Sequence, residues 1–235
     1  MPAEGSPGRD AAPSRGRRYS TFVGIAFLIL VAVATVNTIG TEGPGTLGAG
    51  TADYGMPLPE FAVPNARTGP LDKDANIAQD DCSTSQNPCP PEARRTPACE
   101  IQARGAIRVC DLFNRPLVIS FWFTRGADCL PTQDVVDRVA ARYRGRVNFL
   151  SIDVRDDPEE VRSIVAERRW TMPVGYDRDG AVSDLYRVGV CPTLAFAYPG
   201  GILAFAKIGE PSAPALITEV ERLLARSRQR AAVDR

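Results

Sequence analysis

The alternation of apolar strands and amphipathic helices in the middle of the chain most constrains its fold. Residues 117–123 (LVISFWF) form a nearly continuous apolar run, which is typical of a central strand covered on both faces. A helical pattern at residues 131–143, a strand pattern at 147–154 and a second helix at 157–168, opened by Asp-Pro, follow in that order. This order requires a right-handed parallel crossover, so we predict an α/β fold.

The C-terminal part adds an antiparallel pair and a last helix. Residues 193–198 and 202–206 are short apolar runs joined by a Pro-Gly-Gly sequence, which predicts a β-hairpin. Residues 213–227 carry an apolar stripe at helical spacing and are predicted to form a helix packed on the sheet. The charged residues 229–235 are expected to be a solvated tail.

An uncharged apolar run dominates the N-terminal region. Residues 22–39 carry no charge and would span about 27 Å as a helix, close to the thickness of a bilayer core. We therefore predict a transmembrane anchor over residues 20–40, and a signal peptide cleaved after Ala34 is the alternative. The tail 1–19 is predicted to be disordered, and because its arginines precede the span, the positive-inside rule places it in the cytoplasm.

The rest of the chain is then expected to lie outside the cytoplasm, attached to the cell membrane by a single pass. The Gly- and Thr-rich residues 41–56 are predicted to be a flexible linker. An extracytoplasmic location agrees with the six cysteines of the chain, because disulfides persist in oxidising compartments.

Composition excludes several kinds of chemistry. The 235 residues include no histidine, which excludes Ser-His-Asp and Cys-His nucleophiles and His-containing zinc sites. Lys and Arg together number 28, as do Asp and Glu, and no basic block stands out, so nucleic acid is not expected as a partner. We expect no cofactor, and the cysteines remain as the candidates for chemistry.

A proline-rich insertion near residues 72–107 interrupts the predicted domain, residues 57–228. Four cysteines lie in or beside this insertion: Cys82, Cys89, Cys99 and Cys110. A loop of this length with little apolar content needs covalent links to be ordered, so we predict structural disulfides, for which three connectivities exist. A zinc site is the alternative, but the spacings contain no Cys-x-x-Cys pair, and no metal is predicted.

Four short motifs follow one another along the domain. They are PLPEFAVP at residues 57–64, FWFT at 121–124, PVGYDRDG at 173–180 and VCPT at 190–193. Together they resemble segments of the TlpA/ResA-type redoxins, a family of membrane-anchored thioredoxin-like proteins. The resemblance implies a thioredoxin-like fold, in which helices flank a central mixed sheet and Pro192 is cis. It also implies thiol-disulfide exchange with a protein substrate.

The cysteine pair of that family is incomplete in this chain. Where the family has Trp-Cys-x-x-Cys, residues 125–129 read RGADC, so Gly126 occupies the position of the attacking cysteine and Cys129 that of the resolving one. Disulfide exchange needs two sulfurs, because one attacks and the other resolves the mixed disulfide. A second sulfur must therefore come from elsewhere in the chain.

The resemblance supplies a candidate for the second sulfur. In the thioredoxin-like fold the residue before the cis-proline lies against the start of the active-site helix, which makes Cys191 the expected partner of Cys129. Three alternatives remain: Cys110 is the partner of Cys129, the Cys129–Cys191 pair is a structural disulfide without turnover, or both residues are unpaired buried thiols. We expect Cys129 to be the attacking thiol and Cys191 to resolve.

Two charged neighbours have opposite effects on the stability of the Cys129 thiolate. Arg125 stabilises it, as the helix N-terminus does, whereas the like charge of Asp128 destabilises it. Asp128 is also predicted to cap the helix, with Pro131 in the first turn.

Two functional hypotheses remain open at this point. The first is an extracytoplasmic thiol-disulfide oxidoreductase with a non-standard cysteine pair. The second is a thioredoxin-like binding or scaffold module that has lost turnover, since a fold does not determine a function.

Overall fold

The computed structural model contains two compact units, residues 1–43 and 44–235, which are described separately. It describes residues 23–31, 54–69, 77–78, 83–84, 87–88, 97–126 and 128–233. The predicted tail 1–19 and nearly all of the predicted linker lie outside the described residues, as do Cys82 and Cys89.

In the N-terminal unit, residues 23–31 form a helix with exposed side chains. The remainder of the predicted anchor lies outside the described residues. Among the helices that the structure describes, none combines the length and the apolar character that crossing a bilayer requires. The transmembrane anchor therefore stays a prediction.

The C-terminal unit is built on a five-stranded mixed sheet with the order β10-β9-β6-β7-β8. The strands are β6 (Leu117–Trp122), β7 (Asn148–Val154), β8 (Val174–Asp177), β9 (Thr193–Tyr198) and β10 (Ile202–Ile208). β6, β7 and β8 are parallel, whereas β9 is antiparallel to both β6 and β10. All six residues of β6 are buried, which explains its continuous apolar sequence. The predicted parallel crossover and hairpin are confirmed.

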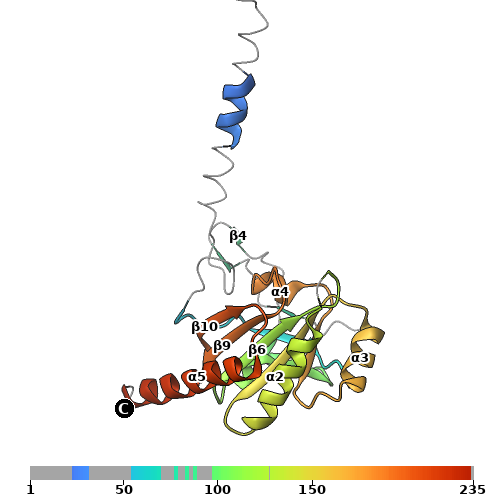
Figure 1. The fold of residues 1–235 in the computed structure, drawn as a ribbon, viewed down its shortest axis with the longest axis vertical. Coiled ribbons are helices and arrows are strands. Elements are labelled where there is room, and N and C mark those ends of the chain that lie inside the picture. The colour runs from blue at the N-terminus through green and yellow to red at the C-terminus, as the bar shows by residue number, and fades with distance from the viewer. Residues whose placement is uncertain are drawn as a thin grey trace, which may run out of the picture. The chain divides into compact units, whose positions relative to one another are not determined.

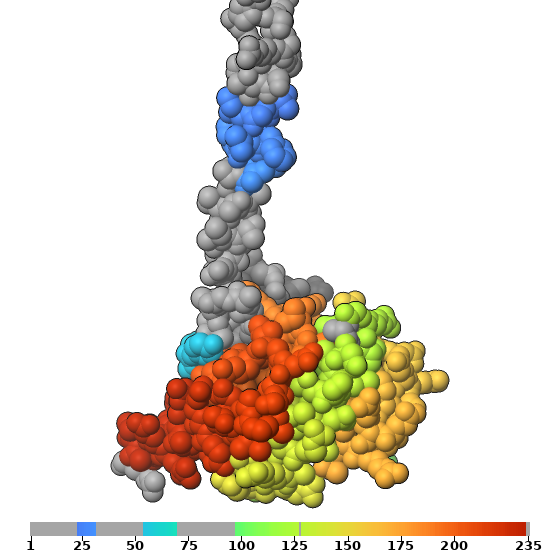
Figure 2. All heavy atoms as spheres, in the orientation of Figure 1, coloured from blue at the N-terminus to red at the C-terminus, as the bar shows by residue number. Residues whose placement is uncertain are grey.

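Helices and a second sheet cover the two faces of the central sheet. The helices are α2 (Leu130–Arg142), α3 (Pro158–Glu167), α4 (Ala181–Leu185) and α5 (Ala213–Val233). Apolar side chains of α2, α3 and α5 pack in one core cluster, and α2 and α5 lie side by side on that face (Figures 1 and 2). Side chains of α4 and of the strand β1 (Phe61–Pro64) pack in the cluster of the opposite face. This arrangement confirms the thioredoxin-like fold.

The second sheet includes part of the predicted insertion. Its order is β2-β1-β5, and both of its pairings are antiparallel. The remaining elements of this region are β1 (Phe61–Pro64), β2 (Ile77–Ala78), β3 (Ser83–Thr84), β4 (Asn87–Pro88), the short 3-10 helices η1 (Ala98–Glu100) and η2 (Val109–Leu112), and β5 (Ala106–Arg108). The end of the insertion is therefore a structural part of the domain, since β5 pairs with the buried strand β1.

The C-terminal helix is longer than predicted. α5 continues to Val233, so the expected helix end at residue 227 is wrong, whereas residues 229–233 are exposed to solvent as predicted. Three arginines, each one turn of the helix apart, explain the difference. The guanidinium groups of Arg222, Arg226 and Arg230 lie 5.8, 6.0 and 5.5 Å from the centroids of the Phe205 or Tyr198 rings. Cation–π contacts of this kind favour continuation of the helix along the sheet edge while its charged face stays in solvent.

Candidate functional site

A disulfide joins Cys129 to Cys191 across 62 positions of sequence, and the two Cα atoms are 6.2 Å apart. Cys129 immediately precedes α2, and Cys191 precedes β9 in the loop that contains Pro192. The Cys191–Pro192 peptide bond is cis, which confirms the prediction for Pro192. The fold thus brings together the two cysteines that the sequence singled out, although their catalytic role stays a prediction.

The two sulfurs of this disulfide differ in accessibility. Cys129 is 1% exposed and belongs to the core cluster beneath α2. Cys191 is partly exposed, and its neighbours Gly189 and Val190 lie on the surface. Of the two residues, Cys191 is therefore the more exposed to an incoming molecule, although its Sγ also lies 3.8 Å from the backbone carbonyl oxygen of Phe123.

Cys129 occupies the N-cap position of α2, and no described side chain caps that helix end. The prediction that Asp128 caps the helix is wrong, because α2 begins at Leu130 and Asp128 lies one residue too early, with an exposed side chain. Pro131 lies in the first turn, as predicted. The amide groups of that first turn have no acceptors within the helix, so they and the helix dipole stabilise negative charge on the Cys129 sulfur.

The loop before α2 differs from a two-cysteine active site. Gly126 has a φ of +80°, a left-handed conformation that a residue with a Cβ adopts only with strain. Arg125 is exposed, and its Nε lies 3.7 Å from Asp156 Oδ1. Arg125 thus forms an ion pair with a carboxylate, and its support of the Cys129 thiolate stays a prediction.

Two aspartates at the end of β7 lie behind this loop. The backbone N–H of Thr124 donates to Asp156 Oδ2 at 2.6 Å, which fixes the start of the loop. Asp153 is completely buried, and among the described residues neither of its carboxyl oxygens receives a hydrogen bond. Burial, and next the charge of Asp156, hold the pKa of Asp153 well above its usual range. Asp153 is therefore protonated at pH values where an exposed aspartate is ionised.

A buried hydrogen-bond network attaches the first turns of α2 to the sheet. Gln133 Nε2 donates to Ser120 Oγ on β6 at 2.8 Å, and Ser151 Oγ on β7 donates to Gln133 Oε1 at 3.0 Å. All three residues are buried. Because Gln133 lies one turn after Cys129, the network holds the sulfur in register with the sheet.

The sequence analysis missed these polar residues behind the site. Asp153 and Asp156 stand three residues apart at the end of a predicted strand, next to the loop that the FWFT motif identifies. That position could have predicted their proximity to the loop, because the carboxyl ends of parallel strands and the loops that follow them lie at the same edge of the sheet. Gln133 gave no signal of its own, since a single polar residue in a helix is usually solvated.

A second disulfide joins Cys99 to Cys110, with a Cα–Cα distance of 5.8 Å. Of the three ways to pair the four cysteines of the insertion, only one contains the link between Cys99 and Cys110. It also rules out Cys110 as the partner of Cys129 in this structure. Cys99 lies in η1 and Cys110 in η2, so the disulfide fastens the end of the insertion to the segment before β6.

Comparison with known proteins agrees with this geometry. No family model matches the chain. The thiol-disulfide oxidoreductase ResA of Oceanobacillus iheyensis is 26% identical over 99 residues, which are 42% of this chain and 52% of ResA. This similarity to ResA agrees with the resemblance to the ResA/TlpA-type redoxins that the sequence motifs indicate. The chain spans about half the length of the curated relative that it matches.

Two solved structures share the thioredoxin-like fold of this domain. One is a protein from Chlorobium tepidum assigned as the thiol:disulfide interchange protein DsbE, with 16% identity, a TM-score of 0.54 and coverage of 74% of this chain and 99% of that one. The other is an uncharacterized conserved protein from Geobacillus kaustophilus, also at 16% identity and a TM-score of 0.54, covering 75% of this chain and 84% of that one. At this level of identity they establish the fold.

Proposed function

We propose that the domain is a thiol-disulfide oxidoreductase whose redox centre is the Cys129–Cys191 disulfide. The observation that carries this proposal is the placement of the disulfide, between the N-terminus of α2 and the cis-proline loop. One sulfur is buried and the other is partly exposed, so the two have distinct chemical roles. The substrate class is a protein thiol or disulfide, as the relationship to ResA supports.

The exposure of the sulfurs sets the order of the exchange steps. A substrate thiolate attacks Cys191 Sγ, the Cys191–Cys129 bond breaks, and Cys129 leaves as a thiolate. A second substrate thiolate then attacks the substrate sulfur of the mixed disulfide and releases Cys191. Two electrons have passed from the substrate to the domain, and the substrate holds the new disulfide. This order reverses the roles that the sequence predicted for the two cysteines.

The environment of Cys129 suits it to the role of leaving group. The uncapped N-terminus of α2 stabilises negative charge on Cys129 as it leaves, against the opposing cost of burying that charge in the core cluster. In the reverse direction Cys191 attacks a substrate disulfide, and the buried Cys129 resolves the mixed disulfide. The difference in reduction potential between domain and substrate decides the direction.

A redox titration of the native chain tests this proposal. We expect Cys129 and Cys191 to become alkylated together and reversibly as the ratio of reduced to oxidised dithiothreitol rises, with mass spectrometry reporting each cysteine peptide separately. If Cys129–Cys191 stays closed in every buffer that leaves the circular dichroism spectrum unchanged, the domain is a redox-inert module. The absence of a cysteine at Gly126 is the observation that favours that second function.

We further propose that the domain is held at the outer face of the cell membrane by residues 20–40. The uncharged apolar run, the arginines before it and the cysteine content support this location.

Fractionation of cells tests the anchor. We expect the full chain in the membrane fraction, resistant to extraction at high salt and alkaline pH, because a span of this length is inserted into the bilayer. A matched chain lacking residues 1–40 should move to the soluble fraction. N-terminal sequencing provides the opposing outcome, since a mature protein that begins at Thr35 would be secreted after cleavage of a signal peptide.

A further inference from the structure

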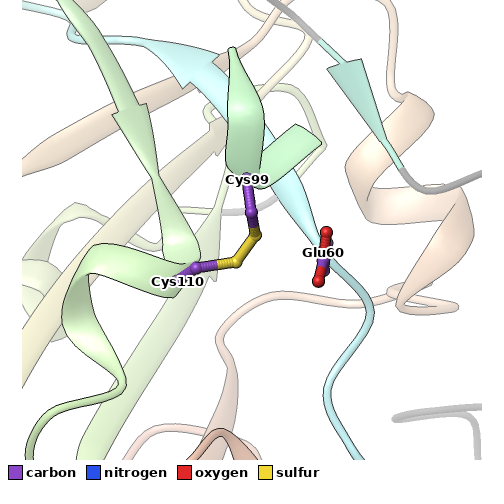
Figure 3. A group of neighbouring side chains, drawn as sticks. All are labelled: Glu60, Cys99 and Cys110. Atoms are coloured by element: carbon purple, nitrogen blue, oxygen red, sulfur yellow. A yellow bond between two sulfur atoms is a disulfide. The ribbon is translucent and has the colours of Figure 1, made fainter. Parts of the chain in front are cut away.

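Three potential metal ligands meet on the sheet face opposite the proposed redox centre. Glu60 immediately precedes β1, Cys99 lies in η1 and Cys110 lies in η2. Their carboxylate and sulfur atoms all lie within 4.8 Å of one another, and all three residues are partly buried. Figure 3 shows the Glu60 carboxyl group beside the Cys99–Cys110 disulfide. Cys110 packs on the core cluster around β1, whereas Cys129 and Cys191 belong to the cluster around α2.

We propose that reduction of the Cys99–Cys110 disulfide creates a binding site for a borderline-soft divalent cation such as Zn²⁺, with Cys99, Cys110 and Glu60 as its ligands. A dithiol supplies the two electrons. Its two sulfurs form a new disulfide while the Cys99–Cys110 bond breaks, and the two cysteines take up its two protons. Binding of the cation then releases two protons, because thiolates and not thiols coordinate zinc.

The arrangement of the two turns does not depend on the disulfide alone. Arg108 Nη1 donates to the backbone carbonyl oxygen of Cys99 at 3.3 Å. The same guanidinium holds Asp111 through two hydrogen bonds of 2.9 Å, to both carboxylate oxygens. Arg108 thus bridges η1 and η2 through contacts that involve no sulfur. The strand β1 begins directly after Glu60, and it pairs with β5. We therefore expect the three ligands to stay close when the disulfide opens.

The donor set fits zinc without histidine. Thiolate sulfur at about 2.3 Å and carboxylate oxygen at about 2.0–2.2 Å are both ordinary zinc ligands. Tetrahedral geometry at these bond lengths separates two sulfurs by about 3.8 Å, so the two sulfurs must move apart by about 2 Å once their bond is broken. Three protein ligands leave a fourth position for water. The cation also offsets the repulsion that the Glu60 carboxylate would exert on two neighbouring thiolates.

Metal titration of the full chain in detergent micelles tests the proposal. After reduction with a phosphine, which does not itself supply thiols, Co²⁺ should produce a sulfur-to-metal charge-transfer band, and Zn²⁺ should displace it with a stoichiometry of one. The oxidised chain should show no such band. Equal binding in the two redox states would overturn the proposal.

Variants assign the ligands. In a chain with Cys82, Cys89, Cys129 and Cys191 replaced by serine, the site should be retained, and Glu60→Gln should weaken Zn²⁺ binding by at least about tenfold. Glu100→Gln is the matched control, because Glu100 is exposed and adjacent to Cys99, and it should leave binding unchanged.

The same comparison in the otherwise native reduced chain covers the case in which the four serines impair folding. There, Cys99→Ser with Cys110→Ser should abolish the charge-transfer band. Unchanged affinity in Glu60→Gln, or a band of unchanged intensity in the double serine variant, would show that the metal binds elsewhere. Because this test reads metal binding, it is independent of whether Cys129–Cys191 exchanges with substrates.

Discussion

Replacing Cys129 by serine should trap substrates on Cys191 in stable mixed disulfides, whereas replacing Cys191 by serine should trap none. In Cys129→Ser the partly exposed Cys191 still attacks a substrate disulfide, and no second sulfur resolves the product. In Cys191→Ser the remaining thiol is 1% exposed and out of reach. Both variants should lose turnover by at least about a hundredfold, because each lacks one of the two sulfurs that exchange requires.

A disulfide-containing peptide with a mass tag measures this asymmetry. Intact-mass spectrometry of each variant after incubation gives the yield of mixed disulfide, and circular dichroism establishes that both variants are folded. Trapping by Cys191→Ser in place of Cys129→Ser would restore the roles predicted from the sequence. Equal inertness of the native chain and both variants would favour the binding module.

The sequence was sufficient to predict the fold because long-range order follows from local patterns. The buried strand 117–123, the Asp-Pro that opens α3 and the Pro-Gly-Gly between β9 and β10 are local signals with physical causes. In the structure, the side chain of Asp157 accepts hydrogen bonds from the backbone N–H groups of Glu159 and Glu160, as expected of a helix cap. The alternation of strands and helices also predicted the parallel crossover, and this placed the loop before α2 at the end of β6.

Relative exposure at the site could not be predicted in the same way. The family pattern marks Cys129 and Cys191 as neighbours, but burial depends on what packs around each sulfur. Cys129 lies under the first turn of α2 because Gln133 ties that turn to β6 and β7. Contacts between residues on three separate elements leave no periodicity in the sequence. The proposed attacking and resolving roles therefore rest on exposures that the sequence pattern does not encode.

The capping of α2 shows the same limit on a smaller scale. A pattern of Asp-Cys-Leu-Pro is compatible with a helix that begins one residue earlier or later. The structure begins the helix at Leu130, so Cys129 takes the N-cap position that Asp128 was expected to hold. This one-residue difference places a sulfur, rather than a carboxylate, at the positive end of the helix dipole.

Asp153→Asn should stabilise the domain at neutral and alkaline pH and flatten its pH dependence. Burial raises the pKa of Asp153 in the folded domain, so folding holds a proton that the unfolded chain releases above about pH 4. The stabilising contribution of this proton is complete below the unfolded pKa and is lost as pH rises through the folded pKa. Over that interval the parent should lose up to about 1.4 kcal/mol of unfolding free energy per pH unit relative to the variant.

The surroundings of Asp153 make asparagine a suitable replacement. The charged and titratable groups around it are Asp156, Asp177 and Tyr176, and burial raises the pKa of Tyr176 to about 12. The two carboxylates disfavour ionisation of Asp153, whereas a neutral amide of the same size keeps the packing. The amide also supplies a donor for Asp156 Oδ1, which receives no hydrogen bond from the described residues.

Urea unfolding of parent and variant between about pH 5 and 9 measures the difference in slope. Asp184→Asn is the control, because Asp184 lies exposed on α4 and its replacement should leave both stability and slope unchanged. A variant whose stability runs parallel to that of the parent would mean that Asp153 is ionised in the folded domain. That outcome would contradict the effect of burial, because an aspartate as buried as Asp153 is expected to hold its proton well above the usual pKa of the group.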